Sequence, residues 1–390
     1  MAQLRLTLLA MSLLILSPAM DGGGGGTVQA QIVPAVISFG DSTVDVGNNN
    51  YLPGAIFKAN YVPYGVNFGS RRKPTGRFSD GKIVTDITAE TLGFESYAPP
   101  YLSPQAKGDN LLLGANFASA ASSYHDDTAA MYQLKYYKEY QSKLAALIGQ
   151  KNATAILSDA LYIVSTGTGD FIQNYYHNAS LSSRYNVNSY CDLLISIFSG
   201  FANVSTLPPP SSSQLLYNCM RCTGTLAASC VYGLVTIACA ELYRLGARRI
   251  GVTSLPPLGC LPATIRLYGK GRSGCVERLN GDAETFNNKL NITVEALAKK
   301  HSDLKIAIFD IYTPLQNMSE SPASQGFLEA RKTCCQTGTR KTRVYLCNPA
   351  TAGLCRNASD FVYFDGVHPS EAANLVIAES TISAGISLVT

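Results

Sequence analysis

The chain has little charge and little histidine. Only 15% of its 390 residues are Asp, Glu, Lys or Arg, and the formal net charge is +4. This excess of positive charge is too slight and too scattered to indicate nucleic-acid binding. The chain has four histidines, at positions 125, 177, 301 and 368, so few side chains can serve as a neutral general base.

Long hydrophobic runs are also lacking. The apolar run at residues 6–16 is too short and too poorly flanked to span a membrane. Arg5 precedes it, and Val28-Gln29-Ala30 offers a small-residue cleavage site, a pattern typical of a secretory signal peptide. We therefore expect a signal peptide at residues 1–30 and one domain over residues 31–390 of an extracellular, secreted protein.

The 11 cysteines of a secreted chain favour disulfide bonds over a metal site. Those at 219, 222, 230 and 239 are loosely spaced with no acid or histidine nearby, which argues against zinc. Cys260 and Cys275 can close one short loop. The cysteines at 334, 335, 347 and 355 can close two more, although spacing does not decide their pairing. We expect no metal and no cofactor.

Short apolar strands alternate with amphipathic helices along the chain. The expected strands are residues 33–39, 111–117, 160–166, 248–254 and 304–309. The expected helices are residues 80–92, 131–148, 278–300 and 370–386. This alternation predicts an α/β fold with a parallel sheet covered by helices on both faces.

A reactive loop is predicted where the first strand ends. The apolar run 33–39 leads into Gly40-Asp41-Ser42, and ligands bind just beyond the carboxyl ends of parallel strands. A serine in this position usually caps a helix, so it becomes a candidate nucleophile only if a base lies near it.

The candidate base lies near the other end of the chain. In Asp365-Gly366-Val367-His368-Pro369 an acid precedes an imidazole by three residues, and Pro369 suits the first turn of a helix. The imidazole can take the proton of Ser42, and the carboxylate can orient the imidazole. We expect Ser42, Asp365 and His368 to be catalytic.

Two further strands are expected to end in small residues at the same edge of the sheet as Ser42. These are Ala118-Ser119-Ala120 and Gly167-Thr168-Gly169, whose backbone N–H groups are candidates to bind an oxyanion. Small residues also allow tight turns between strand and helix, and this structural explanation is equally good for any one of them.

Together, these motifs resemble the plant GDSL-type esterase/lipases of the SGNH hydrolase superfamily, from about Val33 to the C-terminus. The resemblance implies a three-layer α/β/α, flavodoxin-like domain with a parallel sheet of about five strands, a Ser/Asp/His site and hydrolysis of acyl or acetyl esters. The matching blocks are Phe39–Ser42 with Asp45–Asn50, Gly76–Gly81, Gly114–Ala120, Gly167–Phe171, Leu255–Pro262 and Asp365–Pro369.

The chain departs from the family pattern at two places. Gly169 stands where the family usually has an Asn whose side-chain amide binds the oxyanion. Ala120 and Ala121 stand where glycines are common, and a backbone donor survives there if φ is negative. The expected oxyanion donors are therefore the N–H groups of Ser42, Ala120, Ala121 and Gly169.

The sequence predicts a secreted serine esterase that acts on small-molecule or polymer-linked esters. It leaves open whether the protein also associates with the cell wall. Two alternatives are a catalytically weak, wall-associated binding protein of the same fold and an acyltransferase that passes the acyl group to an alcohol. Asn-x-Ser/Thr sequons, which fit a secreted glycoprotein, lie at Asn152, Asn178, Asn203, Asn291, Asn317 and Asn357.

Three other features have structural explanations beside functional ones. Arg77 is expected to brace backbone carbonyls or an acid, although it can also face a substrate carboxylate. The tyrosines of residues 132–140 and 175–176 either line an aromatic cleft or lie half-buried on helix faces. Residues 202–239 hold one charged residue and a Pro/Ser run, and we interpret them as an insertion, either a surface loop or a retained intron.

Overall fold

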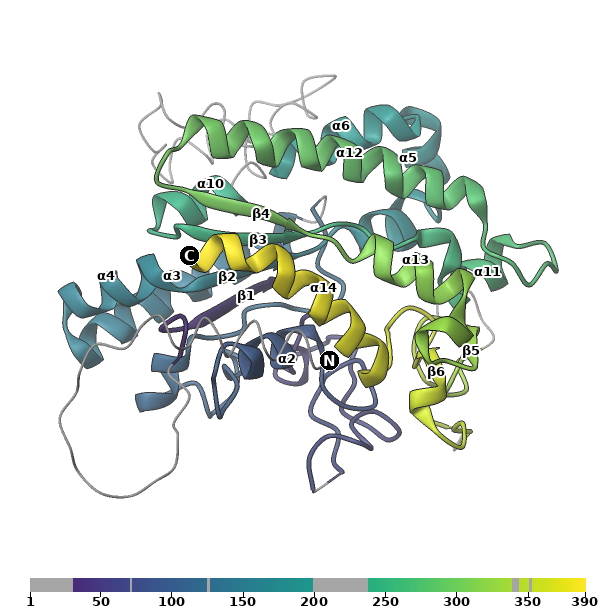
Figure 1. Ribbon diagram of the computed structural model, residues 1–390, viewed down its shortest axis with the longest axis horizontal. Helices are drawn as coiled ribbons and strands as arrows, with labels where there is room; N and C mark the ends of the chain where they lie inside the picture. The colour runs from purple at the N-terminus through teal and green to yellow at the C-terminus, as the bar shows by residue number, and fades with distance from the viewer. Residues whose placement is uncertain (1–30, 71, 125–126, 199–237, 339–343, 351–352) are drawn as a thin grey trace. The chain divides into compact units, whose positions relative to one another are not determined.

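Four short parallel strands form the centre of the protein. They are β1 (Val36–Gly40), β2 (Leu161–Ser165), β3 (Arg249–Thr253) and β4 (Lys305–Phe309), hydrogen-bonded in the order β1-β2-β3-β4 (Figure 1). All five residues of β1 and of β2 are buried. Their continuous apolar sequences are therefore those of parallel strands covered on both faces.

Alternate residues of the strands enter two different apolar cores. Leu161 and Ile163 of β2 belong to the core that includes Leu388 of α14 (Glu371–Val389) and Ala89 of α2 (Val84–Thr91). Tyr162 and Val164 belong to the larger core on the opposite face of the sheet. That core contains side chains of α3 (Asp127–Ile148), α6 (Val187–Phe198) and α12 (Glu277–Lys300). The expected three-layer α/β/α class is confirmed.

The expected strand at residues 111–117 is wrong over its first half. Leu111 lies in a 3-10 turn, Gly108–Leu113, and Gly114 then turns the backbone with a φ of 97°. Only Asn116 pairs with the sheet, through a parallel bridge to Ser38 of β1. This short edge segment lies beside β1 on the side away from β2, so the order along the sheet is the flavodoxin-like one.

The four expected helices are present with small changes at their ends. α2 begins at Val84, four residues later than expected, because the Asp86 carboxylate accepts the N–H of Ile83 just before the helix. α14 begins after Ser370, whose Oγ accepts the N–H of Ala373. The shorter helices are α4 (Gln150–Asp159), α5 (Ala179–Arg184), α10 (Ala238–Arg244), α11 (Pro262–Tyr268) and α13 (Tyr312–Glu320).

α14 is, in the described part of the chain, the one helix long and apolar enough to cross a membrane by length and composition. Its Ala373, Ile377 and Leu388 are buried against the sheet and its neighbours. These contacts identify α14 as a covering helix of the fold.

Within the described residues, three disulfide bonds hold loops near the carboxyl ends of the strands. Cys260–Cys275 closes one loop, and Cys334–Cys355 and Cys335–Cys347 close the two expected further along. The last two lie close to a small parallel pair of strands, β5 (Glu329–Thr333) and β6 (Phe361–Tyr363). Cys191 is a buried free thiol, and burial raises its pKa to about 12.

The computed structural model describes residues 31–70, 72–124, 127–198, 238–338, 344–350 and 353–390. The expected signal peptide lies outside these residues. Residues 202–237 of the segment interpreted as an insertion also lie outside them, together with Asn203 and three of the cysteines of that segment.

Candidate active site

Ser42 follows the end of β1 by two residues, and the strand end is held from two sides. Gly40 has a φ of 140°, and a Cβ there would overlap the backbone of Ser165 in β2, so only glycine fits. The Gln133 side chain accepts the Gly40 N–H at 2.9 Å and donates to the Gly40 carbonyl at 2.9 Å. These contacts fix the backbone from which the Ser42 loop starts.

Asp41 shapes the turn around Ser42. Its Oδ1 accepts the N–H of Thr43 at 3.0 Å and the Thr43 hydroxyl at 2.6 Å. Burial raises the pKa of Asp41, although these hydrogen bonds from Thr43 act in the opposite direction. Ser42, between the two, is only partly buried and lines a cavity.

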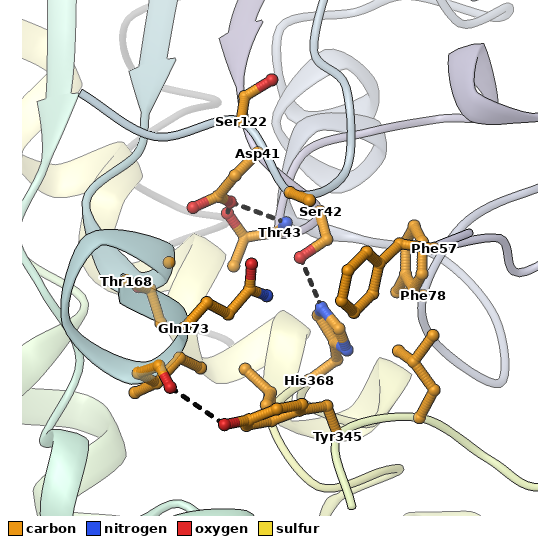
Figure 2. A pocket seen from close by; sticks show the side chains of 15 residues that line it. Asp41, Ser42, Thr43, Phe57, Phe78, Ser122, Thr168, Gln173, Tyr345 and His368 are labelled. Atoms are coloured by element: carbon orange, nitrogen blue, oxygen red, sulfur yellow. Dashed lines mark hydrogen bonds between the residues drawn. The ribbon is translucent and has the colours of Figure 1, made fainter. Parts of the chain in front are cut away.

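Ser42, His368 and Asp365 form a hydrogen-bonded chain, although the first and last lie more than 300 residues apart. The His368 Nε2 lies 2.7 Å from the Ser42 Oγ (Figure 2). The His368 Nδ1 lies 2.8 Å from Oδ2 and 2.9 Å from Oδ1 of Asp365. Asp365 is fully buried and His368 is 4% exposed. An acid, an imidazole and a hydroxyl in this order suit nucleophilic catalysis.

The Asp365 carboxylate is held by donors besides His368. Its Oδ1 accepts the backbone N–H groups of Val367 at 2.9 Å and His368 at 2.7 Å. The Tyr64 hydroxyl donates to Oδ2 at 2.7 Å and accepts the Cys347 N–H at 3.0 Å. Burial and the neighbouring Asp365 raise the pKa of Tyr64 well above its usual range, so this hydroxyl remains a donor.

The expected oxyanion donors are not equally available. The N–H of Ala120 donates to the Asp45 carboxylate at 3.1 Å, so it is already occupied. The N–H groups of Ser42, Ala121 and Gly169 have no hydrogen-bond partner among the described residues. These three residues line the same cavity as His368.

Ala121 and Gly169 have backbone conformations that reverse the usual preferences of alanine and glycine. Ala121 has a φ of 72°, a left-handed conformation that glycine adopts more easily, so the condition of a negative φ is not met, and the alanine instead takes the backbone conformation of a glycine, with its N–H unpaired among the described residues. Gly169 has a φ of −60° and a ψ of −36° at the start of a π-helical turn, Asp170–Tyr175. Any residue can adopt that conformation.

The cavity beside Ser42 is small. Its volume is about 20 Å³, which is enough for about one water or methyl-sized group. Side chains of Phe57, Phe78, Ile172, Tyr345 and Val367 give it apolar walls. The Phe78 ring also packs on the imidazole of His368, with ring centroids 4.9 Å apart.

The structural role expected for Arg77 is confirmed, whereas three of the tyrosines are more deeply buried than either alternative proposed. Arg77 donates to both oxygens of Asp86, at 2.6 and 2.7 Å, in a buried ion pair. Tyr137 and Tyr140 are fully buried in the core under α3, and Tyr175 is nearly so. The tyrosine that does line the cavity is Tyr345.

Sequence reasoning missed Gln133 and Tyr64, which hold the two ends of the hydrogen-bonded chain from Ser42 to Asp365. Gln133 precedes Tyr137 and Tyr140 by four and seven residues, so it lies on the apolar face of α3. A lone amide on such a face is a usable signal, because buried polar groups need partners. Tyr64 gave no comparable signal in a chain with 22 tyrosines.

No group of three His, Cys, Asp or Glu side chains capable of holding a metal occurs within the described ranges. The exposed surface carries the asparagines of five sequons, Asn152, Asn178, Asn291, Asn317 and Asn357.

The chain was compared with protein-family models, curated proteins and solved structures. A family model for GDSL-like lipase/acylhydrolase matches residues 36–381. GDSL esterase/lipase APG of Arabidopsis thaliana is 48% identical over 366 residues, 92% of this chain and 93% of that protein. Another GDSL esterase/lipase of that plant is 46% identical over 368 residues, 92% and 91% of the two chains. A solved structure of a putative GDSL-like lipase from Parabacteroides merdae shares 13% identity, with a TM-score of 0.35 over 91% of this chain and 97% of that one.

A parallel sheet with helices on both faces, and a hydroxyl, an imidazole and a carboxylate joined at its carboxyl edge, form an arrangement that the class of serine hydrolases uses. The chain belongs to the GDSL-like lipase/acylhydrolase family, which places it among the carboxylic ester hydrolases.

Proposed function

We propose that the protein is a secreted esterase that cleaves carboxylic esters through an acyl-enzyme on Ser42. The supporting observation is the unbroken hydrogen-bonded chain from the Ser42 Oγ through His368 to Asp365. In this proposal the Ser42 Oγ attacks the ester carbonyl while His368 Nε2 takes its proton. His368 then gives the proton to the departing alkoxide, and the Asp365 carboxylate stabilises the imidazolium between the two steps.

Water completes the cycle by attacking the acyl-enzyme, with His368 again acting as the base. The negative charge that forms on the carbonyl oxygen in each half-reaction needs donors at fixed positions. The unpaired N–H groups of Ser42, Ala121 and Gly169 are the backbone donors in this proposal, and Ala120 is left out because Asp45 accepts its N–H.

The small cavity supports esters with a short acyl group. A volume of about 20 Å³ beside Ser42 fits the methyl of an acetyl group and leaves a long acyl chain to lie on the surface. We expect p-nitrophenyl acetate to be cleaved with a higher kcat/KM than the butyrate, and the butyrate higher than the palmitate. A preference for palmitate would contradict the short-acyl part of the proposal.

The test of the mechanism is the steady-state hydrolysis of p-nitrophenyl acetate by the purified secreted protein. Ser42→Ala should abolish turnover, because the remaining groups have no nucleophile to activate. Ser383→Ala, which changes an exposed serine on α14, is the matched control and should retain the wild-type rate. Turnover that survives in Ser42→Ala would refute the proposal.

Secretion is supported by three disulfide bonds and by the exposed asparagines of the sequons. N-terminal sequencing of protein from the culture medium of expressing plant cells should begin near Gln31. Treatment with an N-glycanase should lower its apparent mass. Retention inside the cells, or a start at Met1, would contradict secretion through a cleaved signal.

A further inference from the structure

Gln173 is a polar residue of the cavity to which neither the sequence nor the proposed mechanism assigns a role. It lies in the π-helical turn that follows β2, and it lines the cavity together with Ser42 and His368. Figure 2 shows its side-chain amide extending from that turn toward the Ser42 loop. The residue is partly buried, so its side chain is not simply a solvated surface group.

The Gln173 amide makes no hydrogen bond with any residue that the structure describes. Neighbouring amides are used: Gln133 holds both the N–H and the carbonyl of Gly40, and Asn174 donates to the Ser123 hydroxyl at 3.3 Å. A partly buried amide with two unused N–H donors, facing a cavity that contains a nucleophile, is available to a ligand in that cavity.

The Gln173 amide lies directly beside Gly169. A Cβ placed on Gly169 would lie 3.7 Å from the Gln173 Oε1 and 3.6 Å from the Ser122 carbonyl oxygen. The Gln173 amide therefore lies at the position toward which a side chain on residue 169 would point. Because Gly169 has no side chain of its own, a donor from residue 173 can serve the same part of the cavity.

We propose that the Gln173 side-chain amide donates an Nε2–H hydrogen bond to the oxyanion of the tetrahedral intermediate. This inference rests on the proposed function. As the bond between the Ser42 Oγ and the carbonyl carbon forms, the carbonyl π electrons move to oxygen and the serine proton moves to His368 Nε2. The amide, with the backbone N–H groups, stabilises that oxygen until the C–O bond to the alcohol breaks and the departing alkoxide takes the proton from His368 Nε2.

The test compares two variants that remove the donors while keeping the side chain's approximate size. Gln173→Leu should lower kcat for p-nitrophenyl acetate by roughly a hundred- to a thousandfold, with KM changed much less, because the hydrogen bond forms mainly to the developing charge. Gln173→Glu should lose at least as much at neutral pH, since it places a negative charge beside the oxyanion. Gln316→Leu changes a glutamine on α13 that is also partly buried but does not line the cavity, so it is the matched control and should behave as wild type.

A second measurement separates the donor from a merely structural role. Phenylboronic acid forms a tetrahedral adduct with an active-site serine, so its Ki should rise in Gln173→Leu roughly in proportion to the loss of kcat/KM. The melting temperature, in contrast, should stay close to that of wild type. A normal kcat with a raised KM, or a loss of kcat in a folded variant whose Ki for phenylboronic acid is unchanged, would overturn the donor assignment.

Rescue from position 169 adds a sharper control. In the Gln173→Leu background, Gly169→Asn places a new amide at the adjacent position and should recover part of the lost kcat, whereas Gly169→Ala should recover none. If Ser42→Ala still hydrolyses the ester, the proposed function itself fails. If Ser42→Ala is inactive while Gln173→Leu is as fast as wild type, only the role of Gln173 fails.

Discussion

Arg77→Met should destabilise the protein strongly, because it leaves a buried carboxylate without its partner. Arg77 is 6% exposed, Asp86 is 1% exposed, and the guanidinium donates to both carboxylate oxygens at 2.6 and 2.7 Å. Without Arg77, the Ile83 N–H at 3.0 Å is the donor that remains to Asp86. Removing one partner of a buried pair costs about 3–5 kcal/mol, a large share of a stability of about 5–15 kcal/mol.

Urea titration followed by circular dichroism at 222 nm, with the disulfides intact, measures this free energy of unfolding. Tyrosine fluorescence is the second probe, since the chain has no tryptophan. Arg77→Met with Asp86→Leu should recover most of the loss, because no charge then stays buried. The remaining deficit should be about 1 kcal/mol, from the lost contact to Ile83 at the start of α2. A single variant that loses under about 1 kcal/mol, or a double variant as unstable as the single, would refute the reasoning.

Ala121→Gly should keep its esterase activity, because the proposed donor is the backbone N–H. Its urea concentration at the midpoint of unfolding should be equal to that of wild type or slightly higher. The relief of a left-handed alanine, about 1–2 kcal/mol, is partly cancelled by the entropy of glycine. Gly169→Ala should raise the melting temperature slightly, by a gain of about 0.4–1 kcal/mol, since its φ is negative and its new Cβ meets atoms only at 3.6 Å or beyond. A clear fall in melting temperature would show that the turn does not accept a side chain. Burial raises the pKa of Asp45 from 3.8 to about 6. The folded state then binds the proton more tightly than the unfolded state, so this group's contribution to stability should fall by about 3 kcal/mol as the pH rises from about 4 to about 6. Asp45→Asn should flatten the pH dependence of the free energy of unfolding over that pH range. An unchanged slope of this free energy against pH would contradict the prediction.

The elements that sequence patterns predicted well are those whose burial is uniform. β1 and β2 are apolar at nearly every position and are buried at every position, so they could be located from composition alone. The 111–117 segment has equally apolar residues, but Gly114 takes a positive φ and packs against the Val36 backbone. That close approach to a neighbouring strand is a tertiary contact, and no local pattern reveals it.

In the site, the reactive side chains could be predicted from their residue types, but the backbone donors could not. Ser42, Asp365 and His368 were predicted because their chemistry requires those side chains in a recognisable order, and the structure brings the three together. The backbone donors could not be ranked, because an N–H group looks the same in every sequence. Whether it is free depends on which acceptor the fold brings to it, as Asp45 is brought to Ala120.

The block Asp45–Asn50 shows how a motif beside a nucleophile can act through the backbone of another segment. Asp45 accepts the N–H groups of Gly47 and Asn48 at 2.7 Å each, which closes its own turn, and it also accepts the N–H of Ala120. Asn48 donates to the Ala118 carbonyl at 2.8 Å, and Asn49 donates to the Ala120 carbonyl at 3.0 Å.

These contacts hold the turn after the edge segment by its carbonyls and by one N–H, and they end just before Ala121. The next N–H, that of Ala121, has no partner in the described structure and lines the cavity. The clamp from Asp45 and Asn49 also explains how an alanine is kept at a φ of 72°, since the hydrogen bonds on Ala120 can offset about 1–2 kcal/mol of local strain. Asp45, which occupies the N–H of Ala120, and Asn49 therefore hold the neighbouring N–H at the cavity, where the proposed function requires an oxyanion donor.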